Sequence, residues 1–203
     1  MYKIADIQKK MFEIADEAAK HVDLLAELDG LSGDGDLGET IGKLTKEVIK
    51  KSDEEFEEVG ALFMKTAMAM NKAAPSTLGT LLSSGVMALA KACKGKTELA
   101  AEDIVSFPRI FADAIKEKGH AEIGDKTILD ALYPRAFATE KEFEVAKDLV
   151  QAFKAGGEAA IEGAENTRGM IPKSGRAQWI GERVKDNLDG GAVLCAKIAK
   201  LFV

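Results

Sequence analysis

The sequence has few of the residues that build disulfide frameworks, zinc sites and histidine-based catalytic triads. Its 203 residues include only two cysteines, Cys93 and Cys195, and two histidines, His21 and His120. The cysteines are far apart in helical contexts, so we interpret them as buried free thiols, which suits a reducing cytoplasm. This composition argues against a His/Cys zinc site and a Ser-His-Asp triad. We therefore expect carboxylates, backbone groups and metal to carry any chemistry.

A basic surface and long apolar runs are also missing. The net charge is −6 with a pI of about 5.2, and no basic stripe typical of nucleic-acid-binding domains is evident. No apolar stretch is long enough to span a membrane, and the amphipathic N-terminal segment has no apolar core or cleavage site of a signal peptide. We expect a cytoplasmic protein, with a single domain over residues 1–203, that binds neither nucleic acid nor membrane.

Proline is scarce, with four residues in the chain, whereas alanine, leucine, lysine and glutamate, which favour helix, are abundant. No segment shows sustained period-two alternation, so we predict no sheet. Apolar residues recur at spacings of three and four, which predicts an all-α fold of eight antiparallel helices. The predicted helices cover residues 3–28, 38–51, 53–71, 75–93, 98–118, 126–138, 140–165 and 190–202.

Two of these helix starts rest on capping-box patterns, Ser52 with Glu55 and Thr139 with Glu142. The longest irregular stretch is 166–189, and loops of this length in a domain are usually functional or disordered. Its Trp179 favours docking over disorder, and we interpret this side chain as part of the core.

Residues 28–38, LDGLSGDGDLG, form the most informative motif. Asp29, Asp34 and Asp36 lie within eight positions, separated by glycines and followed by a predicted helix. Hard cations such as Mg²⁺ prefer oxygen ligands, and a helix N-terminus favours phosphate. The run is not an EF-hand, because its twelfth position would be Thr45, and no Walker A loop is present. The motif predicts a metal–nucleotide site, with ordinary Asp-Gly turns as the alternative.

Three further stretches add to this motif: GDKTILDAL at 124–132, GRA at 175–177 with GER at 181–183, and DGGA at 189–192. Together with residues 28–38, in this order and spacing, they resemble the L subunit of dihydroxyacetone kinase. The resemblance covers about residues 3–201. It implies an eight-helix antiparallel barrel that holds ADP or ATP and two Mg²⁺ ions at one end.

The resemblance also assigns residues to this site. Asp29, Asp34 and Asp36 match the metal-binding aspartates. The positions that match nucleotide contacts are Leu37, Gly38, Glu39, Thr40, Ala73, Ala74, Gly119, Ile128, Arg176, Asp189, Gly190 and Gly191. Asp125 and Lys126 are interpreted either as phosphate-site residues or as a helix start with a solvated lysine.

In this family the L subunit passes a phosphoryl group to dihydroxyacetone, which a separate K subunit holds. ADP is recharged by a phosphohistidine carrier of the phosphotransferase system, or free ATP is exchanged. Phosphoryl transfer needs mainly positioning and charge neutralisation, so we expect no catalytic nucleophile in this chain. We therefore predict a kinase subunit that acts on dihydroxyacetone or a related small ketose or polyol and is active only with its partner.

The sequence departs from the family pattern at three places. Leu37 replaces a usual histidine, Asn71–Pro75 replaces a Gly-Gly-x-Ser-Gly stretch, and Asn187-Leu188-Asp189-Gly190-Gly191 replaces His-x-Asp-Pro-Gly. These departures leave open the substrate and the choice of partner, and the sequence does not fix the phosphate donor or the oligomeric state, for which a homodimer is one option. They also keep two alternatives, a non-catalytic nucleotide-loaded regulatory subunit and a helical scaffold that binds divalent ions.

Overall fold

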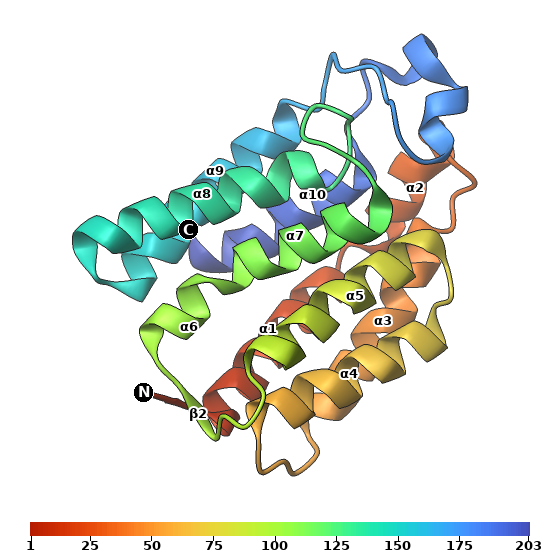
Figure 1. Cartoon of the computed structure of the whole chain (residues 1–203). Helices are drawn as coiled ribbons and strands as arrows, with labels where there is room; N and C mark the ends of the chain where they lie inside the picture. The colour runs from red at the N-terminus through yellow and green to blue at the C-terminus, as the bar shows by residue number, and fades with distance from the viewer.

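Helices joined by short loops make up nearly all of the computed structural model, which describes residues 1–203 (Figure 1). The α-helices are α1 (Ile4–Ala19), α2 (Val22–Ser32), α3 (Leu37–Ser52), α4 (Val59–Ala73), α5 (Thr77–Ala92), α6 (Ala101–Val105), α7 (Phe107–Gly119), α8 (Leu129–Ala146), α9 (Leu149–Glu165) and α10 (Gly190–Ala199). Three 3₁₀ turns are η1 (Arg176–Trp179), η2 (Gly181–Val184) and η3 (Lys200–Phe202). None of the helices combines the length and the apolar character that crossing a membrane requires.

The long helices form a closed ring. Each contacts the next along the chain, from α3 through α4, α5, α7, α8 and α9 to α10, and α10 returns to α1 and α2. Helices α1 and α2 both pack on α3, so they act as one kinked rod. The ring therefore has eight rods, and neighbouring rods run antiparallel as the chain passes up and down between the two ends. This confirms the predicted all-α antiparallel barrel.

The up-and-down course sorts the connections between two ends of the barrel. The α2–α3, α4–α5 and α7–α8 connections and the 166–189 segment lie at one end, seen at the right of Figure 1. The 53–58 loop, the short α6 and both termini lie toward the other end. We call the first the site end and the second the far end.

Apolar side chains from all rods fill the barrel. Leu25, Ile41, Ile115 and Leu129 are almost fully buried in one large cluster that spans it. A smaller cluster lies toward the far end around Leu62. Cys93 and Cys195 are buried free thiols, as predicted, and burial raises the pKa of Cys93 to about 11.

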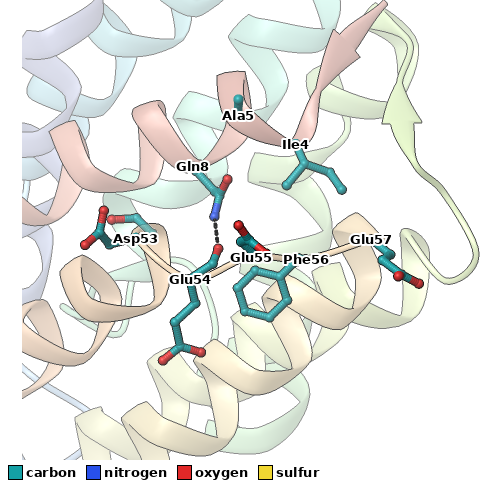
Figure 2. A pocket seen from close by; sticks show the side chains of 9 residues that line it. Ile4, Ala5, Gln8, Asp53, Glu54, Glu55, Phe56 and Glu57 are labelled. Atoms are coloured by element: carbon teal, nitrogen blue, oxygen red, sulfur yellow. Dashed lines mark hydrogen bonds between the residues drawn. The ribbon is translucent and has the colours of Figure 1, made fainter.

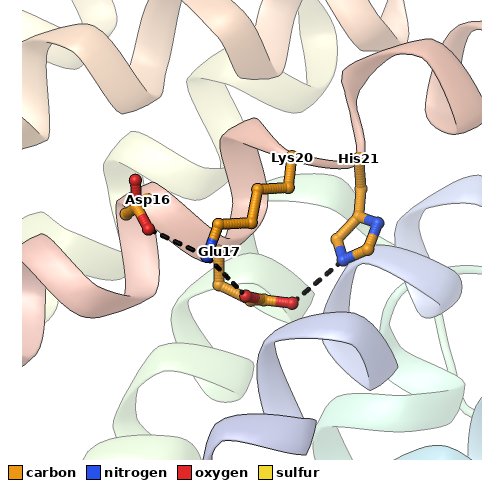
Figure 3. A network of polar contacts seen from close by, with 4 residues as sticks. All are labelled: Asp16, Glu17, Lys20 and His21. Atoms are coloured by element: carbon orange, nitrogen blue, oxygen red, sulfur yellow. Dashed lines mark hydrogen bonds and ion pairs between the residues drawn. The ribbon is translucent and has the colours of Figure 1, made fainter.

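The predicted helix 3–28 is wrong in its continuity and its end. The chain kinks at Lys20 and His21, whose N–H groups donate to the carbonyls of Glu17 and Ala18, three residues back. Around this kink Lys20 contacts Asp16 and Glu17, and His21 Nε2 lies 3.1 Å from Glu17 Oε1 (Figure 3). Helix α2 then continues to Ser32, so that it includes Asp29.

The predicted helix start at Ser52 is also wrong. Ser52 ends α3, and its hydroxyl donates to the Ile49 carbonyl at 2.7 Å instead of capping a new helix. Helix α4 begins only at Val59. The intervening loop lines a hollow of about 730 Å³ against the start of α1, where the Gln8 side chain donates to the Glu54 carbonyl at 2.6 Å (Figure 2).

The break predicted at Thr139 does not occur. Thr139 lies fully buried inside α8, where its hydroxyl donates to the Arg135 carbonyl at 2.7 Å. The chain turns later, at Lys147 with φ 53°, and α8 starts at Leu129 rather than at 126. The predicted helix 98–118 is divided at Ser106 into α6 and α7.

The prediction that the chain has no sheet is wrong in one detail. Strands β1 (Tyr2–Lys3) and β2 (Glu98–Leu99) pair antiparallel, with Tyr2 opposite Leu99. This two-residue ladder ties the N-terminus to the far end of the barrel. It is too short to show the alternation on which the prediction relied.

Candidate metal and nucleotide site

The structure brings the three aspartates of the 28–38 motif together at the site end. Asp29 lies on the last turn of α2, and Asp34 and Asp36 lie in the following turn, just before α3. One carboxylate oxygen from each lies within 4.8 Å of the others. Three carboxylates this close suit a hard cation, which would offset their mutual repulsion. The residues present therefore fit a divalent metal ion.

The glycines of the motif make this convergence sterically feasible. A Cβ atom on Gly33 would lie 2.4 Å from Asp29 Oδ1, so a larger residue would displace the carboxylate. Gly35 has φ +80°, a conformation that other residues rarely adopt. The turn can thus fold back on the end of α2 and place Asp34 and Asp36 beside Asp29.

The start of α3 offers backbone donors beside the carboxylates. The Leu37 N–H donates to Asp29 Oδ2 at 3.3 Å, which fixes that carboxylate. The N–H groups of Gly38 and Glu39 have no backbone acceptor, and Asp36 provides no side-chain cap. Free N–H groups at a helix start, together with the helix dipole, favour phosphate oxygens.

A shallow pocket of about 290 Å³ lies next to this helix start. Asp36, Glu39 and Thr40 line it from α3, and Ala74 and Ser76 line it from the α4–α5 connection. The Thr40 and Ser76 hydroxyls lie 3.0 Å apart, and Ser76 accepts a hydrogen bond from the Gly79 N–H as the cap of α5. Of the predicted pair Ala73 and Ala74, only Ala74 lines the pocket.

Arg176 reaches the site from the 166–189 segment. It also lines the pocket, and its guanidinium forms an ion pair with Asp34. Both side chains are largely exposed. The donor fork of a planar guanidinium matches the geometry of both carboxylate and phosphate, so the same position suits a phosphate contact.

Asp189, Gly190 and Gly191 form the start of α10. Asp189 caps this helix, because its Oδ2 accepts a hydrogen bond from the Ala192 N–H at 2.7 Å. Burial raises the pKa of Asp189 to about 6. A Cβ atom on Gly190 would lie 2.5 Å from Leu37 Cδ2, so Gly190 lets α10 approach α3 closely.

Several residues that were predicted to contact the nucleotide have side chains that pack in the core. Leu37 and Ile128 are 7% and 6% exposed and belong to the large apolar cluster, so their side chains pack in the core, and the Leu37 N–H is already bonded to Asp29. Gly119 ends α7 at the same end of the barrel and packs near Leu81. Leu37, in the position of the usual histidine, thus has a packing role.

Two interpretations from the sequence are wrong here. Trp179 is not a core residue, because it is 84% exposed in η1. Lys126 is not solvated, because it is 5% exposed and its ammonium donates to three backbone carbonyls of the 166–189 segment. Local sequence gives no signal for either, since both depend on where that segment lies.

Comparison with known proteins decides the family. A model of the DAK2 domain matches residues 32–203, which is most of the chain and includes Asp34, Asp36 and Arg176. The chain belongs to the DAK2-domain family. Asp29 lies just before the matched range, and its place in the cluster comes from the structure.

Relatives of this DAK2 domain include subunits and longer kinases. It is 32% identical to a PEP-dependent dihydroxyacetone kinase 2 ADP-binding subunit DhaL of Listeria innocua, over 85% of this chain and 81% of that protein. It is 28% identical to an L-erythrulose kinase of Pectobacterium atrosepticum, over 86% of this chain but only 30% of that one.

A solved structure supports the same fold. The dihydroxyacetone kinase of C. freundii in complex with AMP-PNP and Mg²⁺ matches 95% of this DAK2 domain with a TM-score of 0.71 and 20% sequence identity. The match covers 32% of that chain. At this identity the likeness establishes the helical barrel.

Proposed function

We propose that this DAK2 domain is the nucleotide-binding subunit of a kinase that phosphorylates a small ketose or polyol. The observation that carries the proposal is the convergence of Asp29, Asp34 and Asp36 beside the free N–H groups of α3. The names of the relatives support it, since one is an ADP-binding subunit and another is a sugar kinase.

Each part of the site has a role suited to phosphoryl transfer. The three carboxylates would hold two Mg²⁺ ions, and bound Mg²⁺ supplies charge neutralisation on phosphate oxygens. The N–H groups of Gly38 and Glu39 would orient a phosphate at the start of α3. Arg176, beside Asp34, would add a second donor to the phosphates. These residues bind and position the nucleotide, and none of them acts as a nucleophile.

The acceptor would be presented by a second protein. The pocket beside α3 is shallow and polar, no histidine lines it, and its one lysine, Lys43, forms an ion pair with Glu39. We therefore propose a K-type subunit that brings the substrate to the site end. The relatives phosphorylate different ketoses by name, so dihydroxyacetone and erythrulose are the first acceptors to test.

The decisive experiment is calorimetric titration of ADP into the metal-free protein, with and without Mg²⁺, after removal of any co-purified nucleotide. Tight Mg²⁺-dependent binding is expected. Binding of Mg²⁺ without nucleotide selectivity would favour a scaffold instead. Reconstitution with a K-type subunit then separates a kinase from a nucleotide-loaded regulator, and adding either ATP or a phosphohistidine carrier identifies the donor.

Asp34→Asn tests the metal assignment directly. Losing one anionic ligand is expected to weaken Mg²⁺-dependent ADP binding by about tenfold or more, with the helical circular dichroism spectrum retained. Asp53→Asn, an exposed aspartate at the far end, is the matched control and is expected to bind ADP like the parent protein. Equal ADP affinity in the Asp34 and Asp53 variants would disprove the assignment.

A further inference from the structure

A buried lysine, Lys126, joins the two ends of the segment that carries Arg176, at a place that we call the neck of the segment. The segment from 170 to 185, which we call the cap segment, leaves the barrel after α9 and returns before α10. Its two ends meet at Lys126, whose Nζ donates to the carbonyls of Met170 at 3.1 Å, Val184 at 2.8 Å and Lys185 at 2.8 Å. An ammonium has three donors, so all of them are used.

The turn that holds Lys126 is itself fixed. Lys126 has φ 60°, which is uncommon for a residue with a side chain. The Asp130 carboxylate accepts from the Gly124 and Thr127 N–H groups on either side of it. This local network holds the backbone so that the lysine side chain points into the neck rather than into solvent.

The rest of the cap segment is held more weakly. At the neck, the Gly169 N–H also donates to the Lys185 carbonyl at 2.7 Å. Farther out, the polar contacts with the barrel are the Lys173 N–H to the Asp125 carbonyl at 3.1 Å, the Lys173–Asp125 ion pair at 3.8 Å and the exposed Arg176–Asp34 pair. An exposed ion pair contributes little to stability, whereas carbonyls that are shielded from water and lose their donor are costly.

We propose that Lys126 is a positioning residue for the nucleotide site, because its ammonium fastens both ends of the cap segment and thereby holds Arg176 beside Asp34. Lys126 itself lies in the neck and contacts backbone carbonyls, so it acts through the segment. The effect of Lys126 on nucleotide binding rests on the proposed function, whereas its role in fastening the cap segment does not.

Hydrogen exchange followed by mass spectrometry tests the neck without any ligand. In Lys126→Met the amides of residues 169–187 are expected to exchange about tenfold faster or more, while those of α4 and α5 keep the parent rates. Lys173→Met removes an exposed lysine of the same segment, 66% exposed and 3.8 Å from Asp125 Oδ1, and is expected to leave the neck amides unchanged. Unchanged exchange in a folded Lys126→Met protein would overturn the proposal.

The parent protein provides a second test if Lys126→Met does not fold. Because Lys126 fixes the neck, the Gly169 amide is expected to exchange much more slowly than the amides of η1 at the tip. Equally fast exchange at both places would show that the neck is not fastened and would overturn the proposal.

A double-variant cycle tests whether Lys126 acts through Arg176. Lys126→Met and Arg176→Gln are each expected to weaken Mg²⁺-dependent ADP binding by about tenfold, and the combined variant to lose little more than either alone. Fully additive losses would mean that Lys126 does not position Arg176. Absence of ADP binding in the parent protein would refute the proposed function, yet the exchange experiment would still decide the role of Lys126 in the neck.

Discussion

At the scale of single residues, the site depends on places where a side chain would not fit. Gly38 is the clearest example, since a Cβ atom there would lie 2.2 Å from the Val22 carbonyl and 2.9 Å from Ala26 Cβ. Because Gly38 has no Cβ atom, α3 can start directly against α2. That contact places the free N–H groups of α3 beside the carboxylate of Asp29.

Gly38→Ala is therefore expected to destabilise the protein by about 1–3 kcal/mol, because the backbone of α2 has to move away. Gly30→Ala is the matched control, since Gly30 lies in α2 and has nothing within 4 Å of the added Cβ. There the change is expected to stabilise by up to about 1 kcal/mol, through helix propensity. Urea unfolding of both variants measures the difference, and a more stable Gly38→Ala protein would contradict the packing argument.

Some residues of the site could be predicted from the sequence and others could not. Asp29, Asp34 and Asp36 lie close in sequence, so a local turn is enough to bring them together, as the motif predicted. Lys126 could not be placed from the sequence because its partners lie 44, 58 and 59 positions away along the chain. The burial of Lys126 and the exposure of Trp179 are both set by the path of the cap segment, for which no periodic pattern exists.

At the scale of elements, helix existence was predictable from apolar spacing, and helix ends were not. Ser52 and Thr139 both begin capping-box patterns, yet their hydroxyls bond to carbonyls of their own helices. A capping pattern is satisfied only if the chain already turns there. Tertiary packing of α8 along α9 keeps Thr139 inside the helix. The two helices are so close here that a Cβ atom added to Gly156 would lie 2.0 Å from the Thr139 hydroxyl oxygen.

The kink between α1 and α2 also escaped the periodicity argument, because the apolar face continues across it. Ala18 and Leu25, on either side, are buried in the same cluster. Figure 3 shows the polar contacts at the kink, where Glu17 contacts both Lys20 and His21.

Glu17→Gln is expected to cost less than about 1 kcal/mol, because the contacts are only partly buried. Hydrogen bonds from His21 and Lys20 lower the pKa of Glu17. Its contribution is thus present above the pKa of an unfolded glutamate and is lost as pH falls through the lowered pKa. Urea unfolding at pH 7 and pH 3 should show a smaller penalty at pH 3. Glu144→Gln, at an exposed position of α8 without an ion pair, serves as control.

At the scale of the whole molecule, the carboxylate site joins elements from distant parts of the chain. The site end gathers α2, α3, the α4–α5 connection and the cap segment. A ligand bound there would therefore stabilise the folded barrel as a whole, since unfolding any rod would disperse its contacts.

Mg²⁺ with ADP at about one hundred times the dissociation constant is expected to add about 2.7 kcal/mol to stability. For a domain of this size that corresponds to a rise in Tm of roughly 5–10 °C. Excess EDTA should remove most of the rise, and Asp34→Asn should show little of it. A melting curve that is the same with and without Mg²⁺ and ADP would contradict the proposed site.

The even number of rods has a consequence for how such a barrel combines with other proteins. A ring with eight antiparallel rods starts and finishes on the same side, and here both termini lie at the far end (Figure 1). Another domain can therefore be attached by a linker to either terminus without obstructing the carboxylates. This geometry accommodates two gene arrangements, with the barrel as a separate polypeptide or as one portion of a longer chain, as in the kinase of Pectobacterium atrosepticum.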